Sequence, residues 1–319
     1  MRIASAYALV VLIWSTTPLG IHWSISSLSF SFSIMARMVL AAILCFALLK
    51  LLRKPFISES RDWLIYAASS FGLFPNMLLM YWAAQSVPSG LMSIILGIYP
   101  FCVGVFSIVV LRENPFSPVR ILALLLAIFG LWLVYREQAA AGVDALWGIA
   151  AIVLACLIWG LSSVFVKKLA VNMEPLRLGT GSLVISAPFF IFAWWLADGT
   201  LPTAIDQRSL IGVIYLIIAG SLLGHILWFY VLRACSVASV SLITLITPVM
   251  ALSWGMLAGE QFSAPTLVGA GLILAALGLY QGLVSRVMEW LKLRIRRTSA
   301  RVDGHIIRAE AIDARQIER

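Results

Sequence analysis

The two halves of the chain repeat one pattern of apolar segments and marker residues about 147 residues apart. Each half holds a Leu-Ile-Trp triplet, a Ser-Val pair, a proline and a glutamate in the same order. The markers are Leu12-Ile13-Trp14, Ser86-Val87, Pro100 and Glu113 in the first half, and Leu157-Ile158-Trp159, Ser236-Val237, Pro248 and Glu260 in the second. A repeat of this length predicts that the halves fold into two similar units.

The composition predicts that a lipid bilayer surrounds the chain. Hydrophobic residues make up 62% of the 319 residues and charged residues only 12%, which a soluble protein of this length could not keep in solution. The net charge of +9 would suggest nucleic acid as a partner of a soluble domain. Here the basic residues lie in connections and in the tail, so they indicate membrane topology and no nucleic-acid partner.

Ten apolar runs are candidates to cross a hydrocarbon core about 30 Å thick, which takes roughly 20 residues. They are Ile3–Trp23, Phe32–Leu52, Trp63–Ala84, Leu91–Leu111, Ile121–Tyr135, Leu146–Phe165, Leu178–Leu196, Leu210–Leu232, Ala238–Ala258 and Pro265–Leu283, of which the fifth is the shortest. The sequence therefore predicts an all-α integral membrane protein with ten transmembrane helices. Residues 1–137 form the first five-helix repeat, 138–286 the second, and 287–319 a basic cytoplasmic tail.

The distribution of lysine and arginine predicts the orientation of these spans. With both termini in the cytoplasm, 20 of the 23 basic residues lie inside, only Arg136 and Arg208 lie outside, and Arg37 lies within a span. This bias follows the positive-inside rule. Because five is an odd number, the second repeat must be inserted upside down relative to the first, an arrangement typical of secondary transporters.

The tail suggests a contact with lipid headgroups. Apolar residues recur at helical spacing among basic ones, namely Val284, Val287, Met288, Leu291 and Ile295. One interpretation is a short helix on the anionic cytoplasmic leaflet. The other is a stop-transfer anchor followed by a disordered end.

The reactive side chains argue against an enzyme and against a bound cofactor. Cys45, Cys102, Cys156 and Cys235 lie in or at the end of apolar spans without metal-ligand spacing, so we expect them to be packing residues and expect no metal site. No GxSxG, HExxH, Walker A or GxGxxG arrangement occurs in an exposed connection. All 14 acids lie outside the spans, whereas proton-coupled exporters of cations usually need a carboxylate in the membrane.

Two basic residue types stand away from the ends of their predicted spans, Arg37 and His225. Arg37 either faces a central cavity, where it could hold a carboxylate, or extends to the nearby interface. His225 lies near the middle of the eighth span and could bind substrate, relay a proton or bond a neighbouring carbonyl. If the chain carries a metabolite, its transport is therefore either facilitated diffusion down the metabolite gradient or transport weakly coupled to protons through His225.

Further residues are candidates by type and position. Pro18, Pro100 and Pro248 can each free a backbone carbonyl within a helix, either as a functional hinge or helix break or as a simple kink. Aromatic and polar side chains could line a substrate cavity or only pack, and these are Trp14, Thr17, Asn76, Tyr81, Tyr99, Trp159, Ser163, Trp228, Tyr230 and Thr244. Gly220-x-x-x-Gly224 and Gly255-x-x-x-Gly259 allow close helix approach within the bundle or between protomers, so we expect a monomer or weak homodimer.

The order of the markers resembles the EamA-type branch of the drug/metabolite transporter superfamily. The resemblance rests on Trp14, Trp159-Gly160, Arg37, Pro100, Pro248, Glu113 and Glu260, and it covers residues 1 to about 286. It implies a ten-helix basket that moves metabolites, often amino acids, out of bacterial cells by alternating access. The first half departs from the usual pattern because Ser15, not glycine, follows the tryptophan. Glu113 and Glu260 are expected to cap or pair at helix ends.

The function that these observations predict is a secondary carrier for small metabolites, most consistently an exporter of amino acids or related compounds. A drug exporter is the alternative within the same class, and a non-transporting receptor or scaffold is the alternative from another class. Antiport of phosphate esters is disfavoured because the spans offer one cationic side chain to neutralise phosphate. The expected location is the bacterial cytoplasmic membrane.

Overall fold

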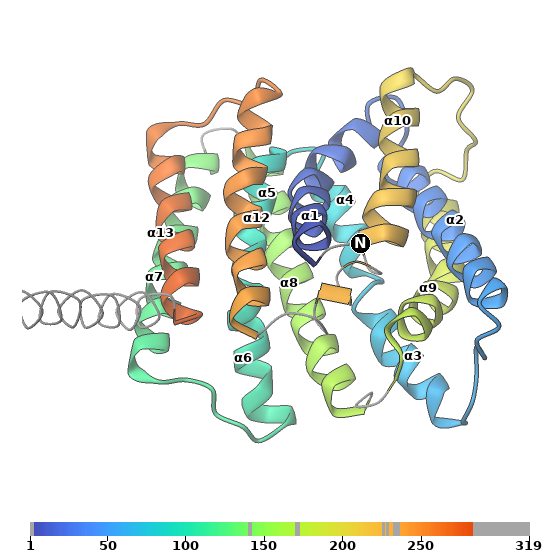
Figure 1. Cartoon of the computed structure of the whole chain (residues 1–319). Coiled ribbons are helices and arrows are strands. Elements are labelled where there is room, and N and C mark those ends of the chain that lie inside the picture. The colour runs from blue at the N-terminus through green and yellow to red at the C-terminus, as the bar shows by residue number, and fades with distance from the viewer. Residues whose placement is uncertain are drawn as a thin grey trace, which may run out of the picture.

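The computed structural model describes residues 3–139, 142–169, 173–224, 227, 230–231 and 237–282. This part of the chain is helical and contains no strand (Figure 1). The helices are α1 (Ile3–Ser24), α2 (Phe30–Leu51), α3 (Arg61–Phe71), α4 (Asn76–Ala83), α5 (Ser89–Leu96), α6 (Tyr99–Val110), α7 (Pro118–Gln138), α8 (Val143–Leu169), α9 (Pro175–Ala197), α10 (Gln207–Tyr215), the π-helix η2 (Leu216–Leu223), α12 (Val237–Leu257) and α13 (Ala264–Tyr280).

Within the described residues, seven helical segments are long and apolar enough to cross a membrane, by length and composition. They coincide with the first seven predicted spans. The three remaining predicted spans coincide with shorter apolar helices over Gln207–Leu223, Ile243–Leu257 and Ala264–Tyr280. The fifth span is longer than its apolar run suggests, because Ser117 caps the helix by accepting a hydrogen bond from the N–H of Arg120 and α7 continues to Gln138.

The third and fourth spans are each interrupted, which the run of apolar residues does not predict. α3 ends at Phe71 and α4 begins at Asn76, and the segment between them contains Pro75, which lacks an N–H to continue the helix. α5 ends at Leu96 and α6 begins at Tyr99. At both interruptions the chain forms tighter turns inside spans that were expected to be continuous, since the N–H of Gly72 bonds Ser69 and the N–H of Gly97 bonds Ile94.

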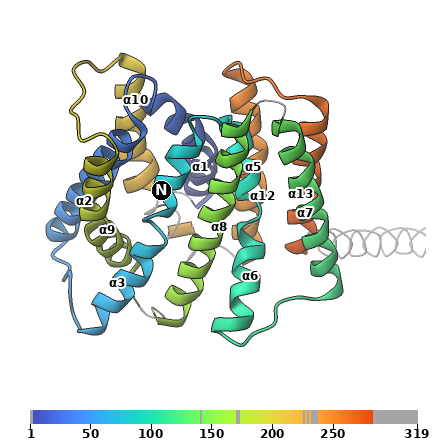
Figure 2. The same cartoon turned by 180° about the vertical axis from the view of Figure 1, so that it is seen from behind.

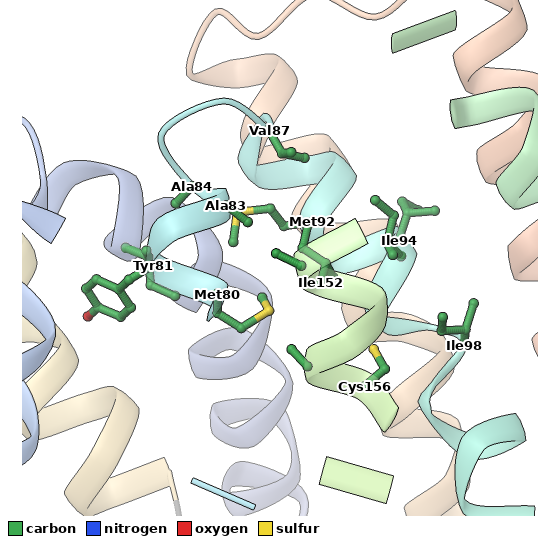
Figure 3. Packing of buried hydrophobic residues seen from close by; sticks show 14 of the residues in the cluster. Met80, Tyr81, Ala83, Ala84, Val87, Met92, Ile94, Ile98, Ile152 and Cys156 are labelled. Atoms are coloured by element: carbon green, nitrogen blue, oxygen red, sulfur yellow. The ribbon is translucent and has the colours of Figure 1, made fainter. Parts of the chain in front are cut away.

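The helices pack in pairs across the molecule. α7 lies against α13 and α2 against α9, while α8 contacts α4 and α6, and α12 contacts α1 and α5. Figures 1 and 2 show the α7–α13 pair on one side and α2, α3 and α9 on the other, with α1, α5 and α8 between them. The largest buried cluster reaches from α2 and α9 to α7 and α13, and in its middle Met80, Met92, Ile94 and Ile152 pack together (Figure 3).

The outward face of α7 is apolar. Its side chains at Ile121, Leu122, Leu125, Ile128, Phe129 and Trp132 are each between 48% and 60% exposed. A patch of this extent would promote aggregation in water, whereas hydrocarbon solvates it. The architecture is thus that of a multi-pass membrane protein.

Candidate functional site

Arg37 lies in the first half of α2 and points into the protein. Its side chain is 5% exposed, so it does not extend to the interface. Nε donates a hydrogen bond to Ser221 Oγ at 3.1 Å, and Nη1 donates to the hydroxyl of Tyr81 at 3.3 Å. Figure 3 shows this hydroxyl turned away from the buried side chains of Ile152 and Cys156. Three separate spans therefore supply the guanidinium and its two hydroxyl partners.

The backbone of η2 passes close to the guanidinium because glycine lies there. Gly220 precedes Ser221 in η2, and a Cβ added there would lie 3.3 Å from Nη2 of Arg37 and 3.8 Å from Oγ1 of Thr17. Thr17 belongs to α1 and donates its hydroxyl proton to the carbonyl of Ile13 at 2.7 Å. A π-helical segment at this position is notable because π-helical turns occur frequently at functional sites.

The charge of Arg37 has no acidic partner among the described residues. The three ion pairs of this part of the chain are Lys54–Glu174, Lys167–Glu113 and Arg177–Asp62, and all of them lie at helix ends. Arg37 is instead held by two neutral hydroxyl groups. A buried cation without a counter-charge is costly in an apolar surrounding, so the site is electrostatically suited to an anion.

A second cluster of predicted residues joins α6 and α8. The rings of Tyr99 and Trp159 are stacked, with centroids 4.0 Å apart and an interplanar angle of 26°. The hydroxyl of Tyr99 donates to Ser163 Oγ at 2.9 Å, and Ser163 donates in turn to the carbonyl of Trp159 at 2.8 Å. These three residues form one unit, which presents aromatic faces and hydroxyl groups from both halves of the chain.

Asn76 lies directly after the interruption between α3 and α4. It is 1% exposed, and its Nδ2 donates to the carbonyl of Ala155 at 2.7 Å. Its Oδ1 has no hydrogen-bond partner among the described residues. The amide thus ties α4 to α8 and leaves one buried acceptor at the break.

The sequence profile of the EamA-like transporter family matches residues 2–136 and again residues 146–280. The chain belongs to the EamA-like transporter family. It is therefore a membrane transporter and not an enzyme.

Two of the three curated relatives reported for this EamA-like chain carry transporter names. The chain is 26% identical to an "Uncharacterized transporter" of Archaeoglobus fulgidus over 68% of this chain and 74% of the relative. It is 25% identical to "Uncharacterized transporter YoaV" of Bacillus subtilis over 83% and 91%, and 27% identical to "Protein PecM" of Dickeya dadantii over 69% and 73%. A solved crystal structure of 16% identity covers 89% of this chain and 98% of its own with a TM-score of 0.62, which shows the fold alone.

The remaining predicted residues of this EamA-like protein lie apart from these clusters or outside the described part. Trp14 packs beside η2, since a Cβ on Gly224 would lie 3.4 Å from its Nε1. Thr244 accepts a hydrogen bond from Gln281 Nε2 at 2.7 Å near the end of α13, and Tyr230 is 42% exposed. His225, Trp228 and the tail at 287–319 lie outside the described residues.

The prolines differ in their positions. α1 continues through Pro18 and α12 continues through Pro248, so neither residue ends its helix. Pro100 lies in the first turn of α6, directly after the interruption at Gly97 and Ile98. A proline is tolerated there because its missing N–H is one that the first turn of a helix leaves unpaired.

Three parts of the Arg37 site were not among the predicted substrate residues: Ser221, Gly220 and the π-helical turn that carries them. The GxxxG spacing of Gly220 and Gly224 did signal a close approach, and the structure places these glycines against Arg37, Thr17, Ile13 and Trp14. No signal in the sequence distinguishes a π-helical turn from an α-helical one in an apolar run.

Proposed function

We propose that this EamA-like transporter is a secondary carrier that exports small metabolites bearing a carboxylate, such as amino acids or related compounds, by alternating access. It works in the bacterial cytoplasmic membrane with both termini in the cytoplasm. The two halves act as inverted five-helix repeats with ten spans in total. Arg37 binds the substrate carboxylate.

The observation that carries this proposal is the buried guanidinium of Arg37 with its neutral partners. Tyr81 and Ser221 fix the direction of two N–H groups but leave the positive charge uncompensated among the described residues. Arginine forms strong, directional hydrogen bonds with carboxylates. A carboxylate bound to the guanidinium would neutralise the site, and its departure would restore the charge for the next cycle.

The pairing of the helices supports the inverted repeat. α1 packs on α12 as α8 packs on α6, and α1 packs on α10 as α8 packs on α3 and α4. In the predicted order of spans, the contact of span one with span nine corresponds to the contact of span six with span four. The contact of span one with span eight corresponds to the contact of span six with span three. Each pair becomes the other when the repeats are exchanged, as a two-fold relation requires.

The stacked rings of Tyr99 and Trp159 favour a second candidate, export of flat aromatic or cationic compounds. Aromatic faces bind organic cations and planar rings without a counter-charge. A drug of this kind would be bound at the aromatic pair and would not depend on Arg37. The metabolite carrier should therefore lose transport in Arg37→Ala, whereas the drug exporter should lose transport in Trp159→Ala.

Transport into proteoliposomes tests the proposal. The panel contains labelled amino acids, a dicarboxylate and a quaternary ammonium dye. Arg37→Ala should reduce transport of the carboxylates by roughly tenfold or more, the loss expected for hydrogen bonds to a charged group. Arg136→Ala, a change at an exposed arginine over the Trp132 ring, is the matched control and should leave transport unchanged.

Three other results would each contradict one claim of the proposal. Transport of the dye alone, lost in Trp159→Ala and kept in Arg37→Ala, would replace the metabolite carrier with a drug exporter. Movement of no solute above empty vesicles would favour a receptor or scaffold. A reporter that is active only outside the cytoplasm, fused after Arg297, should be silent, and its activity would contradict the orientation and the inversion.

A further inference from the structure

Glu260 caps a helix that lies about 170 residues before it in the chain. Its Oε1 accepts a hydrogen bond from the N–H of Ser89 at 2.7 Å, and Oε2 accepts from the N–H of Gly90 at 3.0 Å. These are the first two residues of α5, whose preceding residue, Pro88, provides no side-chain cap. A carboxylate at this position pairs N–H groups that a helix leaves open and favours the positive end of the helix. The prediction that Glu260 caps a helix end is confirmed.

The surrounding residues hold this end of α5 closely against α12. A Cβ on Gly255 would lie 2.3 Å from Oε2 of Glu260, and a Cβ on Gly90 would lie 3.0 Å from Cα of Leu252. His22, at the end of α1, donates from Nε2 to the carbonyl of Val87 at 2.9 Å. His22 of α1 and Glu260, which follows α12, thus both bind backbone groups at the start of α5.

Glu113 occupies the equivalent position in the first repeat but is not engaged in the same way. Arg112, directly before it, has a φ of 58°, and Gly259, directly before Glu260, has a φ of 94°. The same left-handed turn therefore precedes both glutamates. In the described part of the chain, the carboxylate of Glu113 pairs with Lys167 alone, at 3.2 Å, and the side chains are 64% and 65% exposed. Among the described residues it makes no bond to the start of α12.

The two sites lie at opposite ends of the molecule. Figures 1 and 2 show the α12–α13 connection, which follows Glu260, at one end and the α6–α7 connection, which follows Glu113, at the other. In the repeat, His22 corresponds to Lys167, and Ser89 and Gly90 correspond to Ser239 and Val240 near the start of α12. At one end Glu260 caps α5, while the equivalent glutamate at the other end, Glu113, is exposed.

We infer that Glu260 and Glu113 are reciprocal latches of the transport cycle, an inference that rests on the proposed alternating access. In the described state, Glu260 caps α5 and closes its end. In the opposite state, the repeats exchange conformations. Glu260 then releases the N–H groups of Ser89 and Gly90. Glu113 separates from Lys167 and itself caps α12 at the N–H groups of Ser239 and Val240. Each latch stabilises one state, and the balance between them sets the populations of the two states.

A labelling experiment that needs no substrate tests this inference. Ser89 is 1% exposed, so a cysteine there reacts with a membrane-impermeant maleimide only when the α5 end opens. The full-length chain carries Ser89→Cys with its four native cysteines replaced by alanine. Glu260→Gln should speed labelling by about tenfold, because a bond to a charged group is lost from the closed state alone. Glu113→Gln should slow labelling by a similar factor, because it weakens the opposite state.

Two further variants make the result decisive. Glu137→Gln removes a carboxylate that accepts a hydrogen bond from Ser263 at 3.1 Å, near the same end as the Glu260 cap, and should leave the labelling rate unchanged. The double variant Glu113→Gln/Glu260→Gln should return close to the parent rate. Glu113 is exposed, so its variant remains informative if Glu260→Gln does not fold.

Equal labelling rates in the parent and in Glu113→Gln would contradict the proposed latches. Faster labelling in both Glu113→Gln and Glu260→Gln would contradict them as well. Such a result alongside intact metabolite transport would leave the proposed function standing. Opposite shifts without transport of any solute would instead support the latch and contradict the carrier.

Discussion

Gly130 of α7 and Gly269 of α13 meet backbone to backbone. A Cβ added to Gly130 would lie 2.8 Å from the carbonyl oxygen of Gly269, and a Cβ added to Gly269 would lie 2.8 Å from the carbonyl oxygen of Gly130. In a bilayer, helices associate through close packing, since lipid is as apolar as their side chains. This mutual contact therefore holds the α7–α13 pair together.

Gly130→Ala should lower the melting temperature of the protein in detergent. The added methyl group cannot be accommodated against a carbonyl oxygen without separating the helices, and overpacking of this kind costs about 1–3 kcal/mol. Gly271→Ala is the matched control, because a Cβ there meets nothing within 4 Å and alanine favours the helix. Equal melting temperatures for the two variants would show that the close contact does not stabilise the fold.

Tyr81→Phe should weaken binding of carboxylate substrates while the protein stays folded. The change removes the hydroxyl that holds Nη1 of Arg37 at 3.3 Å but keeps the buried ring. One hydrogen bond contributes about 0.5–1.5 kcal/mol, so the KM for transport should rise by roughly twofold to tenfold. Tyr135→Phe, at a 43% exposed position of α7, should leave KM unchanged. A rise of KM of the same size in both variants would argue against positioning of Arg37 by Tyr81.

Much of the fold follows from the sequence because hydropathy and span length act locally. The limits of α1 and α2 lie within two residues of the predicted runs, since apolar segments of about 20 residues in lipid must satisfy their backbone as helices. The interruption before Asn76 was not predicted, because Leu73 and Phe74 continue the apolar run. Span length alone does not reveal where a helix stops and starts again.

The candidate site was only partly predictable because its partners are distant in sequence. Arg37 stood out as a cation within a span, but Ser221 lies 184 residues away, and only the packing of η2 on α2 brings them together. The role of Glu260 as a helix cap followed from its position after a span. Its target, the start of α5, depends on the contact between α12 and α5.

Asp206 should link the stability of the protein to pH in the acidic range. Hydrogen bonds from Ser209, joined by those from Ser26 and Ser27, lower the pKa of this carboxyl to about 2. An unfolded aspartate has a pKa of about 3.9. Because the folded pKa is the lower one, the stabilisation is complete above about pH 4 and is lost as the pH falls towards 2.

Melting curves of the parent and of Asp206→Asn between pH 6 and pH 2.5 check this sign. The parent should melt higher at pH 6, and the difference should shrink as the medium becomes acidic. Asp144→Asn changes an aspartate whose side chain accepts no hydrogen bond from a described residue, and it should show no such trend. A difference between parent and Asp206→Asn that grows on acidification would contradict the expected linkage.

The last prediction concerns the energy source of transport. None of the 14 acidic residues lies in the interior of a predicted span, and every described carboxylate is at a helix end or in a connection. Exchange of protons within the membrane usually needs such a group. In the sequence, His225 is the one histidine near the middle of a predicted span, and histidine is the residue type whose ordinary pKa lies close to pH 7. We therefore expect facilitated diffusion, in which the gradient of the metabolite itself drives flux.

Proteoliposomes loaded with an amino acid separate this mechanism from proton coupling. A zwitterion carries no net charge, so neither a membrane potential nor a pH gradient should be needed to move it. Efflux down its own gradient should continue at an unchanged rate when ionophores collapse both. Accumulation against the amino-acid gradient that requires an imposed pH gradient, and that disappears in His225→Gln with protein levels intact, would make His225 the coupling residue and end the facilitator interpretation.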